Sequence, residues 1–474
     1  MPLLLSALPV VSVIVALVLG ARSIHAAWLG VAMAVLGVLT AFPVANGGAV
    51  LAVWAPVLVE VVLIVGGGLL LSEVLRAAGA QKALAEWVLA RAGRGVGMAL
   101  LVVHGVTPFA ESLTGFGIGI TIGIPLLAHA GLRARNVAAI GLLGLCAVPW
   151  GSMGPGTLIA ATMAGLSFDT LGLASAWVSV IVFVVTGLAA AWLASAPGER
   201  GAALLQGAAS GLLLTGAVVL ANATVGTAPA GALGALVVIG LRLAWAAVRR
   251  RGQAAAPPLP ALGLLGQRAL GAYAVLLGGV LLVGWALKWV HLAGAWHLLA
   301  SPALWLFVAA LWFARGRPGA PVLRPVWRSW RQVAPVTALF ILLGVLMAAS
   351  GMAASLAHAL AQTGPWYLVV APWVAGLGGF VTGSSSGANA MLAATQAEIA
   401  RALGVGLLPF MAVHNVSAAL LMMASPGKIE MACQLAPGQP TADRRWIQGW
   451  VLATALVALV GLALLNLVLA RGWA

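Results

Sequence analysis

Apolar runs of nearly membrane-spanning length recur from one end of the chain to the other, and they restrict its fold more than any other feature. An α-helix needs roughly 20 apolar residues to cross a bilayer. Of the 474 residues, 63% are hydrophobic and only 7% are charged, which excludes a soluble globular protein in practice. The sequence therefore predicts an all-α polytopic membrane protein. The candidate spans are residues 3–20, 24–42, 49–71, 137–166, 171–195, 203–222, 229–248, 268–288, 296–314, 333–352, 407–428 and 447–470.

Two further apolar stretches, residues 96–130 and 365–400, are interrupted near their centres by glycines and small polar residues. Non-helical backbone at membrane depth is tolerated only where protein or a wet cavity satisfies its polar groups. We therefore interpret both stretches as re-entrant hairpins, which gives about twelve transmembrane helices. If each hairpin instead crosses the membrane twice, the count rises to about fourteen.

Basic residues gather in short loops between the apolar runs and give the chain a net charge of +15. Threading the spans through a membrane puts these loops on one side, as the positive-inside rule requires of a cytoplasmic face. This pattern favours a multi-pass protein of the bacterial inner membrane, with the lipid bilayer around it and no nucleic-acid partner. The basic clusters are Arg22, Arg76–Arg94, Arg133 and Arg135, Arg249–Arg251, Arg315–Arg331, and Arg444 and Arg445.

A polar, proline-containing connection at residues 249–267 divides the chain into a first transmembrane half (1–248) and a second (268–474). Similar landmarks recur in both halves: Pro155 follows Thr114 by 41 residues, and Pro426 follows Thr382 by 44. By the threading above, the two copies enter the membrane from opposite sides. Inverted repeats with discontinuous helices are a common plan of secondary transporters, whose site lies between the copies. Chance agreement of short Gly/Pro landmarks in a glycine-rich chain is the alternative.

Glu111 is the only charged residue between Val96 and Leu127, and it directly precedes Ser112–Gly117. A charged side chain at membrane depth costs at least ~2.5–3.5 kcal/mol on insertion scales, so such residues usually face a pathway or a partner. Burial also favours the protonated form of a carboxyl group, which suits a proton carrier. The helix that starts after the glycines would offer N–H groups to an anion. The structural alternative is that Glu111 pairs with His104 and only holds the hairpin together.

The opposite hairpin tip, Thr382–Asn389, carries four hydroxyl groups and one amide within eight residues. A helix interface requires fewer polar groups, so the cluster indicates ligand contact. Small residues also permit close helix packing in lipid, which is the competing interpretation.

Helix-breaking motifs interrupt two of the candidate spans, at Pro149–Thr157 and at Ser425–Lys428. Proline removes a backbone donor and leaves carbonyl groups one turn back free to coordinate a cation or a proton carrier. A simple kink is the alternative. Lys428 is a candidate counter-charge for a substrate carboxylate, unless it snorkels to the interface or pairs with Glu430.

These motifs together give the candidate site. The proton-coupling candidates are Glu111, His104, and Glu60, a carboxylate in the middle of the span 49–71. The substrate-binding candidates are Ser112, Thr114, Gly115, Phe116, Gly117, Thr382, Gly383, Ser384, Ser385, Asn389, Asn415 and Lys428.

At these same segments the chain resembles the bacterial L-lactate permease family. The resemblance implies a proton-coupled importer of lactate, glycolate and related 2-hydroxy monocarboxylates, built from inverted repeats with re-entrant hairpins. It runs in order over roughly residues 50–200 and 330–435. The residues that carry it are Glu111 with Thr114–Gly117 and Pro125–Leu127, Pro149–Gly156, Gly379–Ser384 with Asn389, and Met423–Pro426.

We thus expect a secondary active transporter that imports a small organic anion, L-lactate or a related 2-hydroxy monocarboxylate, by proton symport. The alternative is a sodium- or proton-coupled carrier of another organic anion, such as a dicarboxylate or a sulfonate. An enzyme is not expected, because the nine acidic residues form no closely spaced pair and no His/Cys/Asp cluster suggests a metal site. The sequence predicts no cofactor and leaves the oligomeric state open.

Overall fold

The computed structural model describes residues 2–44, 46–115, 117–129, 131–251, 259–290, 294–316 and 318–471. Within these ranges all regular structure is helical, and no strand occurs. The described helices up to Arg251 are α1 (Pro2–Val18), α2 (Ser23–Thr40), α3 (Gly47–Ala77), α4 (Ala80–Ala92), α5 (Val96–Leu101), η1 (Val102–Val106), α6 (Thr107–Thr114), α7 (Ile118–Ala128), α8 (Ala134–Leu143), η2 (Gly144–Met153), α9 (Pro155–Ala164), α10 (Phe168–Val178), α11 (Val180–Ala194), η3 (Pro197–Glu199), α12 (Arg200–Val225) and α13 (Thr227–Arg251). Those that follow are α14 (Leu264–Trp289), η4 (Gly294–Ala300), α15 (Pro302–Ala314), α16 (Ala320–Ala349), α17 (Met352–Ala361), η5 (Gly364–Trp366), α18 (Tyr367–Thr382), α19 (Ser385–Ala402), α20 (Leu407–Leu420), η6 (Leu421–Ala424), α21 (Pro426–Leu435), η7 (Thr441–Asp443) and α22 (Arg444–Arg471).

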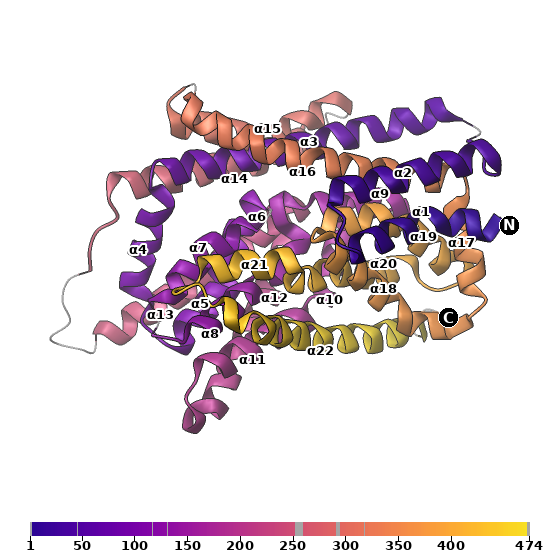
Figure 1. Ribbon diagram of the computed structural model, residues 1–474. Coiled ribbons are helices and arrows are strands. Elements are labelled where there is room, and N and C mark those ends of the chain that lie inside the picture. The colour runs from indigo at the N-terminus through magenta and orange to yellow at the C-terminus, as the bar shows by residue number, and fades with distance from the viewer. Residues whose placement is uncertain are drawn as a thin grey trace.

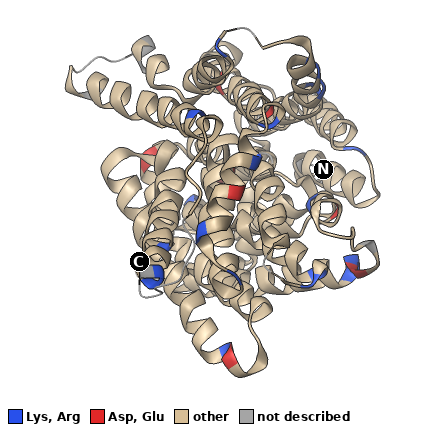
Figure 2. Ribbon diagram, turned by 90° about the vertical axis from the view of Figure 1, so that its left-hand side faces the viewer, with Lys and Arg blue, Asp and Glu red and all other residues tan. Residues whose placement is uncertain are grey.

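The predicted fold class, an all-α polytopic membrane protein, is confirmed. Among the described residues, 11 helices are long and apolar enough to cross a membrane, or up to 12 if a bent pair counts as one span. That pair is α9 and α10, which meet at 112°. Figure 1 shows α3 and α16 along the upper edge of the molecule and α22 along the lower edge, with the interrupted helices between them. Figure 2 shows how sparse the charged residues are on this bundle.

Both stretches that the sequence predicts to be hairpins are broken at glycines. The first break follows α6, where Gly115 (φ 70°) and Gly117 (φ 83°) adopt left-handed backbone conformations before α7 begins. The second follows α18, where Gly383 has φ 63° and Ser384 caps α19 through its side chain. Glycine pays no Cβ penalty in this region, which explains why both helices end there. That the two stretches turn back within the bilayer stays a prediction.

Both helix-breaking motifs interrupt the helices in which they lie. Residues 134–164 form α8, the 3₁₀ segment η2 and α9, with non-helical backbone at Gly151 and Ser152. Residues 407–435 form α20, the 3₁₀ segment η6 and α21. Pro155 and Pro426 each stand at the first position of a new helix, where proline has no hydrogen bond to lose and its fixed φ suits the helix. These prolines therefore start helices and do not kink continuous ones.

The linker differs in extent from its prediction. The basic cluster Arg76–Arg94 is spread over two helices, because α3 continues to Ala77 and α4 begins at Ala80. Helices occupy both ends of the predicted linker 249–267, since α13 runs to Arg251 and α14 starts at Leu264. Residues 252–258 of that linker lie outside the described residues.

Close helix packing holds the second tip in place. A Cβ at Gly344 of α16 would overlap the carbonyl oxygen of Ala390 on α19, and one at Gly379 of α18 would overlap that of Ala418 on α20. Small residues let helices approach this closely in an apolar medium, where van der Waals packing drives association. α18 and α19, which flank the second tip, are therefore fixed against α16 and α20.

Candidate functional site

The Glu111 carboxylate caps the helix that follows the first tip. Glu111 lies in the last full turn of α6 and is 3% exposed. Its Oε1 accepts a hydrogen bond from the Gly117 N–H (3.0 Å), and its Oε2 accepts one from the Gly119 N–H (3.0 Å). N–H groups at a helix start lack intrahelical partners and lie at the positive end of the helix dipole, so a carboxylate stabilises them. The N–H groups that we expected to bind an external anion are thus partly occupied by Glu111 itself.

The other two proton-coupling candidates lie elsewhere. His104 is fully buried, with Nδ1 2.9 Å from Ser210 Oγ and Nε2 3.5 Å from Thr186 Oγ1, so the predicted alternative of a Glu111–His104 pair is not what the structure shows. Glu60 accepts a hydrogen bond from Ser301 Oγ (2.7 Å) and lines a separate cavity. The structure therefore does not bring the three candidates together.

A cavity of about 230 Å³ lies where both tips and both interrupted helices meet. The first tip contributes Glu111 and Gly115, and the second contributes the backbone and side chains of residues 382–387. α16 supplies a further wall. The lining residues are Ser23, Glu111, Gly115, Val148, Gly151, Ser152, Pro155, Gln332, Val333, Val336, Thr337, Phe340, Thr382–Gly387, Met422 and Lys428.

The first tip contacts the interrupted helices of both halves. Ser152, in the break of the first half, donates its hydroxyl to Thr114 O (3.0 Å). Lys428, from the second half, lies so close that its Nζ would be 2.5 Å from a Cβ added at Gly117. Segments far apart in the sequence thus form one polar wall.

The second tip makes the reciprocal contacts. A Cβ at Gly156, next to Pro155, would lie 2.8 Å from Ser385 Oγ. A Cβ added at Gly383 would lie 3.5 Å from Ser425 Oγ. Each tip therefore packs against the interrupted helix of its own half of the chain and against the interrupted helix of the other half.

Lys428 is the most unusual group in this cavity. Only 8% of the residue is exposed, and it stands in the first turn of α21, where the helix dipole disfavours a cation. In the described part of the chain its Nζ has no hydrogen bond and no ion pair within 4 Å, although the Glu111 carboxylate acts on it electrostatically across the cavity. Glu430, its predicted alternative partner, pairs with Arg444. A buried ammonium group without a hydrogen bond is costly, so the cavity is suited to an anion.

About half of the predicted substrate-binding residues line the cavity. Those that do are Gly115, Thr382, Gly383, Ser384, Ser385 and Lys428. Ser112, Thr114, Gly117, Asn389 and Asn415 do not, and Phe116 lies outside the described residues. Thr114 is occupied locally, because its hydroxyl donates to Ala110 O (2.7 Å). Ser112 is fully buried, and a Cβ at Gly231 of α13 would lie 2.5 Å from its Oγ.

Asn389 and Asn415 form a buried polar junction behind the second tip. The Asn389 amide donates to Gly156 O (3.0 Å) and to Asn415 Oδ1 (2.8 Å). The Asn415 amide donates to Thr157 Oγ1 (3.0 Å) and Ser175 Oγ (3.0 Å). Buried amides that are satisfied in this way specify one arrangement of the helices around them. The junction ties α19 and α20 to α9 and α10.

Sequence reasoning missed the wall supplied by α16. Gln332, Val336 and Phe340 are spaced by four residues and so share one helix face. Thr337 lies beside them on the same wall. A glutamine and a threonine on one face of an apolar helix were the available signal. Ser152 and Ser386 also line the cavity, and they are not among the substrate-binding residues that the sequence predicts.

Comparison with known proteins points to one family. The family model described as L-lactate permease matches residues 295–464. The L-lactate permease of Streptococcus iniae is 25% identical over 344 residues, which cover 65% of this chain and 71% of that protein. The L-lactate permease of Escherichia coli (strain K12) is 39% identical over 84 residues. The chain is thus similar to L-lactate permeases, most clearly in its second half. The match to the E. coli protein is confined to 18% of this chain and 15% of that relative's length.

Among solved structures, the crystal structure of the Alcanivorax borkumensis YdaH transporter, which is described as having an unusual topology, aligns with this chain at 16% identity. The alignment covers 90% of this chain and 88% of that chain, with a TM-score of 0.48.

Gly115→Ala should lower the melting temperature of the purified protein. The backbone at Gly115 (φ 70°, ψ −163°) lies in a region almost exclusive to glycine and costs any other residue about 1–3 kcal/mol, and a Cβ there would also overlap Ser152 Oγ. Overpacking adds about 1–3 kcal/mol. Gly131→Ala is the matched control, because Gly131 has φ 76° and nothing lies within 4 Å of its Cβ position. Equal melting temperatures for the two variants would show that the close approach of the first tip to Ser152 is not a constraint.

Proposed function

We propose that the protein is a secondary active transporter that imports L-lactate or a related 2-hydroxy monocarboxylate by proton symport. Similarity to proteins described as L-lactate permeases supports transport and not catalysis. The 11 helices of membrane-spanning length among the described residues are in keeping with a multi-pass protein of the bacterial inner membrane.

The observation that carries this proposal is a buried cation in the cavity whose Nζ has no hydrogen bond and no ion pair within 4 Å. Lys428 is the only Lys or Arg among the described residues that line it, and it faces the same space as Glu111. A carboxylate bound beside the Nζ group would replace the water that burial removes from the ammonium. One cation suits a singly charged anion better than a dicarboxylate, whose second charge would stay unpaired.

The size and lining of the cavity agree with a small hydroxy acid. Its volume of about 230 Å³ is below the roughly 300–1,000 Å³ typical of sites for drug-sized ligands. The hydroxyl groups that line it belong to Ser23, Ser152, Thr337, Thr382, Ser384, Ser385 and Ser386. Such groups can donate to a carboxylate and accept from the 2-hydroxyl of the substrate.

Glu111 is the proposed proton carrier. A proton and a monocarboxylate that bind together add no net charge, so the loaded carrier crosses a low-dielectric centre at lower cost. Protonation of Glu111 would weaken the hydrogen bonds that its carboxylate accepts from the Gly117 and Gly119 N–H groups. The charge of this residue is thereby linked to the conformation of the first tip. The reciprocal contacts between tips and breaks support the inverted-repeat plan, in which the two halves exchange roles during transport.

Uptake of labelled L-lactate into liposomes that contain the purified protein tests the proposal. When the external buffer is more acidic than the liposome interior, we expect labelled lactate inside to exceed its external concentration. At equal pH on both sides, we expect the two concentrations only to become equal. A sodium gradient at equal pH tests the sodium-coupled alternative, and excess succinate or an alkyl sulfonate tests the other substrates by competition. Equilibration without accumulation under a proton gradient would indicate a passive channel and refute symport.

A further inference from the structure

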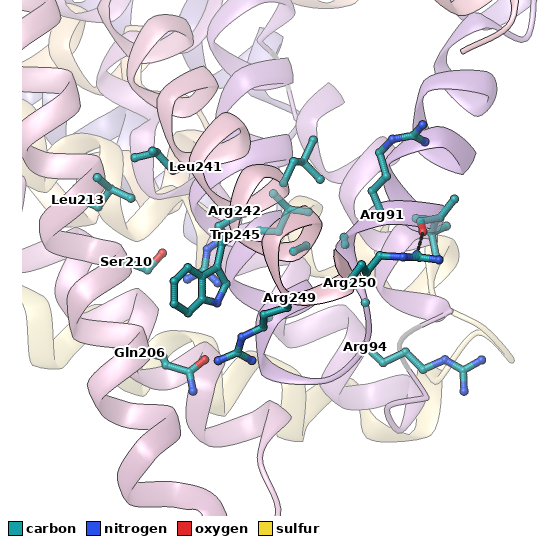
Figure 3. A pocket seen from close by; sticks show the side chains of 18 of the residues that line it. Arg91, Arg94, Gln206, Ser210, Leu213, Leu241, Arg242, Trp245, Arg249 and Arg250 are labelled. Atoms are coloured by element: carbon teal, nitrogen blue, oxygen red, sulfur yellow. Dashed lines mark hydrogen bonds between the residues drawn. The ribbon is translucent and has the colours of Figure 1, made fainter. Parts of the chain in front are cut away.

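A second and larger cavity, of about 1680 Å³, lies between α4, the start of α5, α12 and α13. It shares no lining residue with the cavity around Glu111 and Lys428. Five arginines line it, and Figure 3 shows Arg242 and Arg249 near Trp245 and Gln206 on one side and Arg91, Arg94 and Arg250 on the other.

The positive charge of this basic pocket is not compensated by its own wall. None of its lining residues, all of which the structure describes, is Asp or Glu. Arg91 donates to the carbonyl oxygens of Trp87 (3.0 Å) and Pro260 (2.8 Å), which carry no net charge. No ion pair in the described ranges involves Arg94, Arg242 or Arg249.

Arg242 provides a second sign that a ligand is missing. Its Nε is buried, yet no hydrogen-bond acceptor in the described structure reaches it. An unsatisfied buried donor costs about 1–3 kcal/mol, and more when it is charged. Guanidinium groups recognise phosphate through paired N–H donors, so an oxyanion in this hollow would satisfy Arg242 and reduce the repulsion among its neighbours.

The remaining wall is apolar and continues onto the surface of two membrane spans. Leu241 and Trp245 of α13 line the pocket and are 52% and 61% exposed. α12 and α13 are candidate spans joined at Gly226, so the start of α12 and the end of α13 lie at the same end of the pair. Exposed apolar side chains on such spans face lipid, and tryptophan marks the level of the headgroups. The pocket is therefore cationic within and open toward the edge of the bilayer.

We propose that this basic pocket binds the phosphate headgroup of an anionic membrane phospholipid. Arg242 and Arg249 contact the phosphate, Arg94 adds to the positive charge of the pocket, and the acyl chains lie against Leu241 and Trp245. Free phosphate compounds share the headgroup chemistry but have no chains for the apolar wall. Basic pockets between transmembrane helices recognise lipid headgroups in this way. The proposal does not depend on which anion the protein transports.

Binding of phosphatidylglycerol to the purified full-length protein in neutral detergent, followed by native mass spectrometry, tests this site. We expect phosphatidylglycerol to bind in preference to phosphatidylcholine. Arg94 and Arg249 are exposed, so the double variant R94Q/R249Q should fold normally. Each cation near a membrane surface contributes about fivefold to the affinity for anionic lipid, so the loss of two should weaken phosphatidylglycerol binding about 25-fold.

R324Q/R328Q is the matched control, because it removes two exposed arginines from α16 and leaves the pocket intact. It should bind phosphatidylglycerol like the wild type. The proposal would be overturned if the wild type bound phosphatidylglycerol and phosphatidylcholine equally. It would also be overturned if R94Q/R249Q and R324Q/R328Q lost the same amount of phosphatidylglycerol affinity. Inorganic phosphate that displaces the lipid at equal concentration would identify a soluble phosphate ligand and overturn the lipid assignment.

Discussion

Glu111→Gln is expected to abolish proton-driven accumulation of lactate while exchange of lactate across the membrane persists. A gradient of one pH unit supplies about 1.4 kcal/mol and supports roughly tenfold accumulation when one proton accompanies one anion. Glutamine cannot carry that proton. Exchange of internal for external lactate needs no net proton movement, so it tests whether the site still forms.

Structure at the first tip explains why this variant is informative. A glutamine Oε1 keeps an acceptor for one of the two N–H groups that Glu111 now satisfies, but its amide group turns a donor toward the other. An unsatisfied buried donor costs about 1–3 kcal/mol, so we expect some loss of stability together with the loss of coupling. The measurement is the ratio of internal to external labelled lactate at steady state, with counterflow recorded on the same liposomes.

Glu60→Gln is the matched control, since it removes a second intramembrane carboxylate by the same change. Glu60 accepts from Ser301 and lines a separate cavity, and glutamine retains an acceptor oxygen there. We expect the full tenfold accumulation in this variant. Tenfold accumulation of lactate in Glu111→Gln would show that Glu111 does not carry the proton. Loss of accumulation in Glu60→Gln alone would assign the proton to Glu60.

Features set by local chemistry were predictable from the sequence. Apolar runs predict the helices, and the breaks occur at glycines with positive φ and at prolines that begin helices. Each of these depends on a few neighbouring residues and on backbone sterics. The class of fold and the places where its helices break could therefore be predicted without knowledge of the packing.

Contacts between distant segments were not predictable in the same way. Lys428 was a candidate by its charge, yet nothing in its sequence neighbours places it beside Gly117. Asn389 and Asn415 looked like ligand contacts because they are polar, but their amides join four helices behind the cavity. Polarity in an apolar segment indicates that a partner exists. It does not say whether the partner is a ligand or another helix.

Glu111 illustrates a signal that was present and misinterpreted. Its carboxylate binds the N–H groups of Gly117 and Gly119, six and eight residues further on. An acid just before a glycine break and a new helix is a capping arrangement, and the helix dipole favours it. From the sequence, these N–H groups are expected to bind the substrate. The arrangement changes the expected mechanism, because the substrate and the ionised carboxylate of Glu111 then compete for the same N–H groups, so protonation of Glu111 favours substrate binding.

Lys428→Gln is expected to weaken lactate binding by at least about 2 kcal/mol, or roughly thirtyfold in the concentration for half-maximal counterflow. The reason is the loss of the only cation among the described residues that line the cavity. Lys82→Gln is the matched control, because Lys82 is an exposed lysine on α4 whose contact is Glu86 at 3.8 Å. It should transport like the wild type.

Stability separates this effect from simple misfolding. Burial of an ammonium group that makes no hydrogen bond costs free energy, so glutamine at position 428 should leave the melting temperature in the absence of substrate unchanged or raised. If Lys428→Gln binds lactate weakly but melts no lower than the wild type, the lysine contributes to ligand binding and not to the stability of the fold. Unchanged affinity in Lys428→Gln would show instead that the hydroxyl groups and backbone of the two tips bind the anion without it, and a lower melting temperature would show that Lys428 has a structural partner.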